Sequence, residues 1–272
     1  MTNKISLSAA VLLIYSAGVL QAQTSLVAHW TFDEVSGATA FDSTGNFNGT
    51  LSGSAAFVAG GISGNAVSFD GTATSFVNMG PALPGFTSGD FSLVAWIKTT
   101  TTVVSSIVVS KHEGGTLNGY ALDVNMSATY GQPNKAFFYN STLPGGEAIS
   151  TTTVNNNNWH QLIGVRTAGG NIQLYVDGVL ESTVASQTIV GNSASFLVGG
   201  ANSAGIPTGF FAGLVDDVQL YSGALSSAEV QFLFSNPGQT TAIPEPSAGA
   251  VLAGVLGLGL AWRRRQVGTG KI

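Results

Sequence analysis

The sequence contains no cysteine. Disulfides, thiolate metal sites and cysteine nucleophiles all need that residue, so none of them contributes to this protein. Charged residues are also scarce, at 8% of the 272 residues, against roughly a quarter in ordinary soluble proteins. The fold must therefore depend on apolar packing and hydrogen bonds, with or without a bound ion, and its surface must be largely Ser, Thr and Asn.

Positive charge is the scarcest of all between residues 24 and 240. Only Lys98, Lys111, Lys135 and Arg166 face thirteen carboxylates there, which leaves a net charge of −9. Four scattered cations cannot neutralise a phosphate backbone, so the composition excludes nucleic acid as a partner. An acidic surface of this kind suits divalent cations or neutral ligands better.

The first 22 residues have the three parts of a secretory signal. Lys4 precedes an apolar run that ends at Leu20, and Ala22 offers a small residue for cleavage. The run is short for a retained membrane helix, and polar residues follow it. We therefore expect signal peptidase to remove residues 1–22 and the protein to be exported.

Alternating apolar and polar residues recur along the body of the chain and predict β-strands. The clearest stretches are FSLVAWIK (91–98), WHQLIGV (159–165), NIQLYVDG (171–178) and GLVDDVQLY (213–221). Asp177 and Gly178 predict a two-residue hairpin turn. One short helix is expected after Ala224, where Ser226 and Glu229 have capping-box spacing. With 36 glycines for turns, the pattern predicts an all-β, two-sheet antiparallel jelly-roll sandwich with one short C-terminal helix.

No arrangement of residues in the sequence predicts catalysis. A glycosidase needs two carboxylates across one groove, whereas the adjacent pairs Asp33–Glu34 and Asp216–Asp217 should point to opposite faces of a strand. Serine-hydrolase elbows and phosphate-binding loops are missing as well. We therefore expect a protein that is not an enzyme, with a polysaccharide-active enzyme built from acids on different strands as the alternative.

The histidines and aromatic residues suggest little chemistry on their own. His29, His112 and His160 lack zinc-site spacing, and His160 lacks an orienting partner in the sequence, so we interpret it as a strand-face residue. Asp70 and Asp177 precede glycines and are expected to form turns. Trp30, Trp96 and Trp159 are predicted to pack in the core. The weak candidates for a sugar-stacking surface are Tyr120, Tyr130, Phe138 and Tyr139.

Seven segments in order resemble the laminin-G-like, concanavalin A-like jelly-roll domains of bacterial surface proteins. They are LVAHWTFDEVSG, FDSTGNFNGTL, GNAVSFDG, FSLVAWIK, WHQLIGVR, IQLYVDGVL and GLVDDVQLYSGALSSAEV, which together extend over most of residues 26–234. The resemblance implies a domain over residues 24–236 that binds carbohydrate or protein partners, or that only adds structure.

The same resemblance implies a structural Ca²⁺ ion at one rim of the domain. Its ligands would be Asp33, Asn46, Asn48 and Asp216, with Asp217 as the alternate for Asp216. Carboxylate and amide oxygens are ligands that Ca²⁺ accepts. The alternative is that these residues only cap turns. No ligand-binding residues are predicted.

The C-terminus has the form of a second sorting signal. After a linker at residues 237–243 comes Pro-Glu-Pro at Pro244, Glu245 and Pro246. Sixteen uncharged residues follow, which as a helix would span about 24 Å, and then Arg263, Arg264 and Arg265.

Residues 244–266, before a short tail at 267–272, resemble the PEP-CTERM signal of exported bacterial proteins. The resemblance implies a hydrophobic tail helix, transient anchoring in the inner membrane and recognition by an exosortase. The expected location is the bacterial envelope, cell surface or extracellular matrix.

Overall fold

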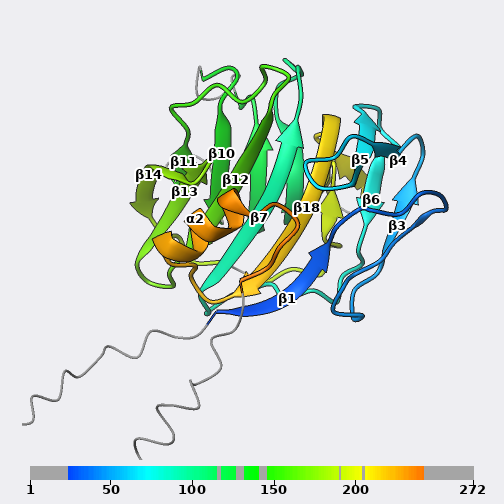
Figure 1. Cartoon of the computed structure of the whole chain (residues 1–272). Coiled ribbons are helices and arrows are strands. Elements are labelled where there is room, and N and C mark those ends of the chain that lie inside the picture. Colours follow the sequence, from blue (N-terminus) through cyan, green and yellow to red (C-terminus); the bar gives the residue numbers. More distant parts are fainter. Residues whose placement is uncertain are drawn as a thin grey trace, which may run out of the picture.

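The computed structural model describes residues 24–114, 118–126, 132–140, 146–189, 191–203 and 206–241. Two β-sheets face each other in a sandwich, and one helix lies against the outer side of one of them (Figure 1). The predicted jelly-roll class is confirmed. The expected signal peptide, sorting signal and tail helix lie outside the described residues. Within the described ranges no helix is long and apolar enough to cross a membrane.

Sheet A contains the strands that the sequence predicts most clearly. All of its neighbouring strands pair antiparallel, and β1 adds to it by pairing with β18. Its strands, in spatial order, are β14 (Val179–Ala185), β13 (Asn171–Val176), β12 (Trp159–Arg166), β7 (Phe91–Lys98), β18 (Ala212–Ser222), β5 (Asn65–Asp70) and β4 (Ala56–Ala59), with β1 at Ser25–Trp30.

Sheet B faces sheet A across the core. Its strands, in spatial order, are β11 (Glu147–Ile149), β10 (Ala136–Asn140), β9 (Asn118–Val124), β8 (Ser106–Gly114), β15 (Leu197–Val198), β6 (Phe76–Asn78), β3 (Gly49–Ser52) and β2 (Thr39–Ala40). Two further short strands, β16 (Ala201–Ser203) and β17 (Ile206–Thr208), form a hairpin that joins β8 through a parallel pairing of β16.

The core between the sheets follows from the period-2 pattern, since every second side chain of a strand points inward. Leu93, Ala95 and Ile97 of β7 are fully buried there in one cluster with Leu122 and Phe138 of sheet B. The sheets approach closely where β12 carries no side chain. A Cβ added to Gly164 would lie 2.3 Å from the ring of Phe138.

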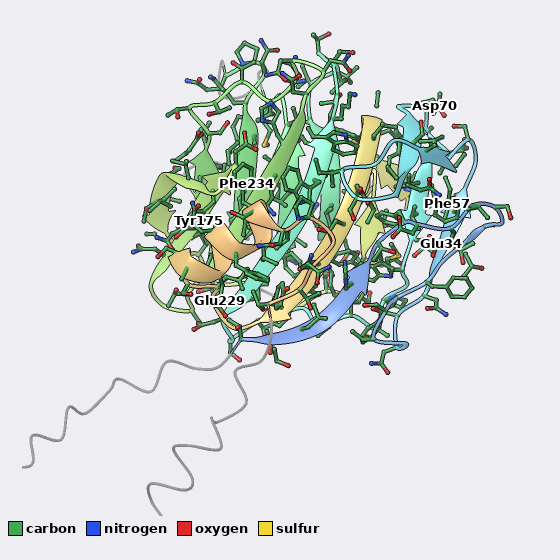
Figure 2. All side chains as sticks on the ribbon, in the orientation of Figure 1. Glu34, Phe57, Asp70, Tyr175, Glu229 and Phe234 are labelled. Carbon is green, nitrogen blue, oxygen red and sulfur yellow. The ribbon has the colours of Figure 1, made fainter. Side chains whose placement is uncertain are left out.

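Helix α2 (Ser227–Ser235) covers the outer face of sheet A (Figure 1). Its capping box is formed as predicted, with Ser226 and Glu229 bonding each other's main chain. Val230 and Leu233 pack onto Val94, Ile163 and Tyr175 of the sheet. Phe234, seen on the helix in Figure 2, stacks on Trp96 with ring centroids 5.8 Å apart. The part of the outer face of sheet A that lies beneath α2 is therefore a second buried core.

The close approach at Gly164 gives a test of the packing between the sheets. We expect Gly164→Ala to lower the free energy of unfolding by about 1–3 kcal/mol, because the new methyl group must displace the Phe138 ring in a packed core. Urea unfolding measures the change. The matched control is Gly89→Ala, where an added Cβ meets nothing within 4 Å. Equal stability of the two variants would contradict the packing described here.

Candidate functional site

Strand β18 changes partners halfway along its length, at Asp216 and Asp217. Residues 212–215 pair with β5, whereas residues 218–222 pair with β1. Against β7 the register breaks between Asp216 and Gln219, and Asp217 has a positive φ of 50°. The sequence predicts a regular strand here, but the structure has a β-bulge, which changes the directions of the two adjacent side chains. As a result, the Asp216 carboxylate bonds to the turn before β5 and the Asp217 carboxylate bonds to β1 and the C-terminal segment.

Asp216 anchors the turn before β5. Its Oδ2 accepts the main-chain N–H groups of Ile62 (2.8 Å) and Ser63 (3.2 Å), and its Oδ1 accepts that of Asp217 (2.8 Å). Asp216 is fully buried. Burial raises its pKa to about 7, although the three N–H donors oppose this rise.

Asp217 connects the first strand to the end of the domain. Its Oδ1 lies 2.6 Å from Nε2 of His29 in β1, and its Oδ2 accepts the N–H of Gly238 at 2.9 Å. The row continues through Gln219 and Tyr221, since Gln219 Nε2 donates to Gln239 O and the Tyr221 hydroxyl accepts the N–H of Thr241. The folded body therefore continues through residues 238–241, within the stretch 237–243 that is predicted to be a linker.

Asp42, which is not among the site residues predicted from the sequence, organises the neighbouring loop. Its carboxylate accepts main-chain N–H groups from His29, Thr44, Asn46 and Phe47, together with the Thr44 hydroxyl. Burial disfavours the charged form, but these donors outweigh it and hold the pKa of Asp42 below its ordinary value. An aspartate followed by Ser-Thr-Gly-Asn is a turn-forming pattern that could have indicated this role.

The hydrogen bonds divide the four predicted calcium ligands between two loops. Asp33 Oδ1 accepts the N–H of Asn65 at 2.9 Å, so Asp33 and Asp216 both hold the turn before β5. Asn48 Oδ1 accepts the N–H of Asp42, and the Asn46 amide donates to Thr44 Oγ1. No group of three or more His, Asp or Glu side chains suited to a metal occurs in the described ranges.

Three of the four aromatic residues suggested for sugar stacking lie inside the molecule. Tyr120 and Phe138 are completely buried and Tyr139 is 3% exposed. That suggestion is wrong for these three residues. The period-2 pattern shows which side chains share a face of a strand, but not whether that face is buried by another part of the protein. Tyr130 lies outside the described residues.

His160 has the orienting partner that the sequence did not reveal. Its Nδ1 lies 2.7 Å from Asp177 Oδ2 and its Nε2 lies 3.0 Å from Asn156 Oδ1. Asp177 has a positive φ, which confirms its place in the hairpin turn. The expectation that His160 lacks a partner is therefore wrong. In the described part of the chain no nucleophile is hydrogen-bonded to this pair.

The outer face of sheet B carries titratable groups from several strands. Asp123 of β9 lies opposite Ile107 of β8 and Phe137 of β10. Two residues along β10 from Phe137, Tyr139 lies opposite Glu147 of β11, so Asp123 and Glu147 share one face of the sheet. Asp123 is 1% exposed, and neither of its side-chain oxygens has a hydrogen-bond partner among the described residues. His112, which contacts Tyr139 edge-to-face at 5.7 Å, has no side-chain partner there either.

Burial disfavours the charged form of both of these groups. It raises the pKa of Asp123 to about 8 and lowers the pKa of His112 to about 4. Buried polar groups without partners cost stability and often mark functional positions. This face thus combines aromatic rings, an uncharged acid and an uncharged imidazole.

A cavity of about 280 Å³ opens at one end of the sandwich, where β7 ends and β18 begins. We call it the Lys98 pocket, and its lining consists of Lys98, Thr99, Thr100, Thr101, Asn157, Ala212, Gly213 and Leu214. Its surface is mostly apolar, and the lining residues with polar side chains are Lys98, three threonines and Asn157. A smaller polar cavity of about 180 Å³ lies between Glu113, Ser193, Ser195 and Asn202.

Hydrogen bonds fix the walls of the Lys98 pocket. The Thr99 hydroxyl donates to Ala212 O at 2.6 Å and accepts the N–H of Thr101 at 2.8 Å. The carbonyl of Thr99 accepts the N–H of Asn157, and the carbonyl of Thr101 accepts the side-chain amide of Asn155. These bonds hold the pocket in shape without a ligand.

The buried acid on sheet B predicts an unusual pH dependence. In the folded state Asp123 keeps its proton up to about pH 8, whereas the unfolded chain releases it near its ordinary value of 3.8. Its contribution to stability is therefore lost as the pH rises between these values. We expect Asp123→Asn to raise the free energy of unfolding at pH 7, by at most about 1.4 kcal/mol for each pH unit above 4.

Thermal unfolding from pH 4 to pH 9 measures this difference, which should vanish towards pH 4. Asp70→Asn is the control with the opposite sign, because hydroxyl and main-chain donors from Ser54 and Thr72 lower the pKa of Asp70 to about 2. A pH-independent difference for Asp123→Asn would refute the assignment of a neutral Asp123.

Several proteins of known structure resemble the whole sandwich. Domain 4 of AbnA, an extracellular arabinanase from Geobacillus stearothermophilus solved in complex with arabinotriose, is 23% identical, with a TM-score of 0.61 over 78% of this chain and 99% of that one. A Trypanosoma rangeli sialidase is 20% identical, with a TM-score of 0.59 over 80% of this chain and 34% of that one. The binding domain of Paraclostridial Mosquitocidal Protein 1 is 14% identical, with a TM-score of 0.57 over 78% of this chain and 52% of that one.

At these identities the structural likeness establishes the fold alone. A search of curated protein sequences finds no match. A family model for the concanavalin A-like lectin/glucanases superfamily, of the laminin G type, matches residues 70–231. That match covers more than half of the sequence and agrees with the two-sheet architecture, and the chain therefore belongs to the concanavalin A-like lectin/glucanase superfamily.

Proposed function

We propose that this protein is an exported, non-catalytic carbohydrate-binding domain of the bacterial cell surface or extracellular matrix. The observation that carries the proposal is the Lys98 pocket, which is preformed and open. Sugar sites combine an apolar surface for the C–H face of a ring with a few placed polar groups for its hydroxyls. Leu214, Ala212 and the threonine methyl groups supply the first, and Thr100 and Asn157 supply the second.

The position of the pocket supports a role in display. Thr24 donates to Glu229 Oε1 at 2.6 Å, and Thr241 bonds to Tyr221, so both ends of the described chain lie near the last residues of β18 (Figure 1). Leu214, at the other end of β18, is about 23 Å from Tyr221 at 3.3 Å per residue. A protein held by its C-terminal segment would thus present the pocket away from its anchor.

The fold of the arabinanase domain also supports this proposal, because that protein was solved with a bound oligosaccharide. Export by signal peptidase and sorting by an exosortase remain proposals from the two terminal segments. A protein-binding role or a purely structural role in the matrix would be the conclusion if no glycan binds.

The proposal predicts glycan binding that a bulky residue in the pocket abolishes. We expect the purified full-length chain in mild detergent to bind a subset of a broad glycan array. Thr100→Trp should weaken this binding at least tenfold, because the indole fills the cavity, and calorimetry on the best ligand measures it. Thr50→Trp, at an exposed position of β3, is the matched control. Silence across the array would refute carbohydrate binding, and equal affinity of the two variants would refute the site.

A polysaccharide-active enzyme is the second candidate, and one observation favours it. Asp123 is neutral near pH 7, as a general acid must be, and Glu147 lies on the same outer face of sheet B. Two strand spacings and two residues separate their Cα atoms, about 12 Å. Release of reducing ends from a polysaccharide by the wild type, but not by Asp123→Asn or Glu147→Gln, would establish this activity in place of simple binding.

Structural calcium at the rim stays a prediction. Asp33, Asn46 and Asn48 of the predicted ligand set are exposed, whereas the second carboxylate, Asp216, is buried and already held by three N–H donors. If an ion binds there, a chelator should lower the melting temperature of the wild type and leave Asp33→Ala unchanged. Differential scanning calorimetry with and without chelator tests this, with Asp90→Ala as the control. Superimposable wild-type curves would exclude a structural ion.

A further inference from the structure

Three of the four cations between residues 24 and 240 are engaged by the protein itself. Lys111, 2% exposed, donates to the carbonyls of Pro81 (3.0 Å) and Ala194 (2.8 Å). Arg166, 3% exposed, donates to the carbonyls of two residues in the loop before β7 and to a serine hydroxyl. Lys135 donates to the carbonyl of Thr151. All three of these cations are therefore already engaged in holding loops.

Lys98 differs from them in both its bonding and its surroundings. Its ammonium makes no hydrogen bond or ion pair to any residue of the described ranges, and it lines an open cavity that contains no carboxylate. The nearest acid by register is Asp216 of β18, which pairs with Trp96, two residues from Lys98, and its carboxylate is already held by three main-chain N–H groups. Asp70 lies one strand further away, on β5, and its carboxylate accepts the N–H and hydroxyl of Thr72.

We infer that the Lys98 pocket binds an acidic saccharide, with the ligand's carboxylate on the Lys98 ammonium and its ring against Leu214 and Ala212. This inference rests on the proposed carbohydrate-binding function and names its ligand class. A charge-assisted hydrogen bond from an ammonium to a carboxylate is about twice as strong as a neutral one. Thr100, an exposed residue beside Lys98, offers a hydroxyl to the same group or to a ring hydroxyl.

Because the whole domain is negatively charged, the binding of an anionic ligand depends on the local positive charge of Lys98. The net charge of −9 on residues 24–240 repels anions at long range and suits cations or neutral ligands. An acidic sugar therefore binds only where a short-range contact overcomes this repulsion. Among the described residues the Lys98 pocket combines a free ammonium with a cavity, so removing this one charge should remove the preference for acidic ligands.

The test compares matched acidic and neutral ligands on the full-length chain in mild detergent. The probes are trigalacturonate against its carboxyl-reduced neutral counterpart, and sialyllactose against lactose. We expect at least one acidic member to bind about tenfold more tightly than its neutral partner, the equivalent of one charged hydrogen bond. Lys98→Gln should abolish that difference, and Lys98→Arg should keep most of it. Lys135→Gln, which removes a cation outside the pocket, should leave it unchanged.

The possible failures are distinguishable. Equal binding of acidic and neutral ligands, or a preference that survives Lys98→Gln, overturns the acidic-ligand inference and leaves carbohydrate binding standing. Binding of no glycan at all overturns both. Melting temperatures of the variants show whether each is folded. Because the Lys98 ammonium makes no hydrogen bond to the described residues, Lys98→Gln should melt within about 2 °C of the wild type.

Discussion

The structure depends on the bulge at Asp216 and Asp217 in the central strand β18. This strand contacts β7 along one side, and on its other side it must serve two different strands, β5 and β1. The bulge separates these two pairings, and each of its two carboxylates forms hydrogen bonds on one side of it. Asp216 holds the turn that leads into β5, while Asp217 binds His29 of β1 and the N–H of Gly238. First strand, last strand and C-terminal segment are thus joined at one point.

The scarcity of charge explains how the charges are used. Two ion pairs, His29–Asp217 and His160–Asp177, each join a histidine to an aspartate. Carboxylates such as Asp42 accept main-chain N–H groups, and Lys111 and Arg166 donate to main-chain carbonyls. Loops have unpaired main-chain groups that must be satisfied when they are buried. A protein without disulfides and with long loops uses its few charged side chains to satisfy these main-chain groups. The Lys98 ammonium is an exception, because it bonds to none of them.

The sequence predicts those features that depend on local pattern. Strands β7, β12, β13 and β18 agree with their predicted positions within a few residues, because period-2 alternation and the Asp177–Gly178 turn are local signals. Helix α2 begins where the capping box predicts. The local sequence pattern does not predict features that depend on contacts between residues far apart in the chain. The partner of His160 comes from the next hairpin, and the burial of Tyr120 and Phe138 depends on which face of sheet B meets sheet A.

The same limit applies to the Lys98 pocket, and it follows from the geometry of sandwiches. Strand patterns show what faces the core, but a rim pocket is assembled from strand ends and loops that are far apart in the sequence. Here the walls come from the end of β7, the segment containing Asn157 and the start of β18. Asp217 and Tyr221 fix the end of β18 that lies near Thr241, and the proposed ligand pocket opens at the opposite end. One strand therefore connects the segment around Thr241 with the proposed ligand pocket and sets the distance between them.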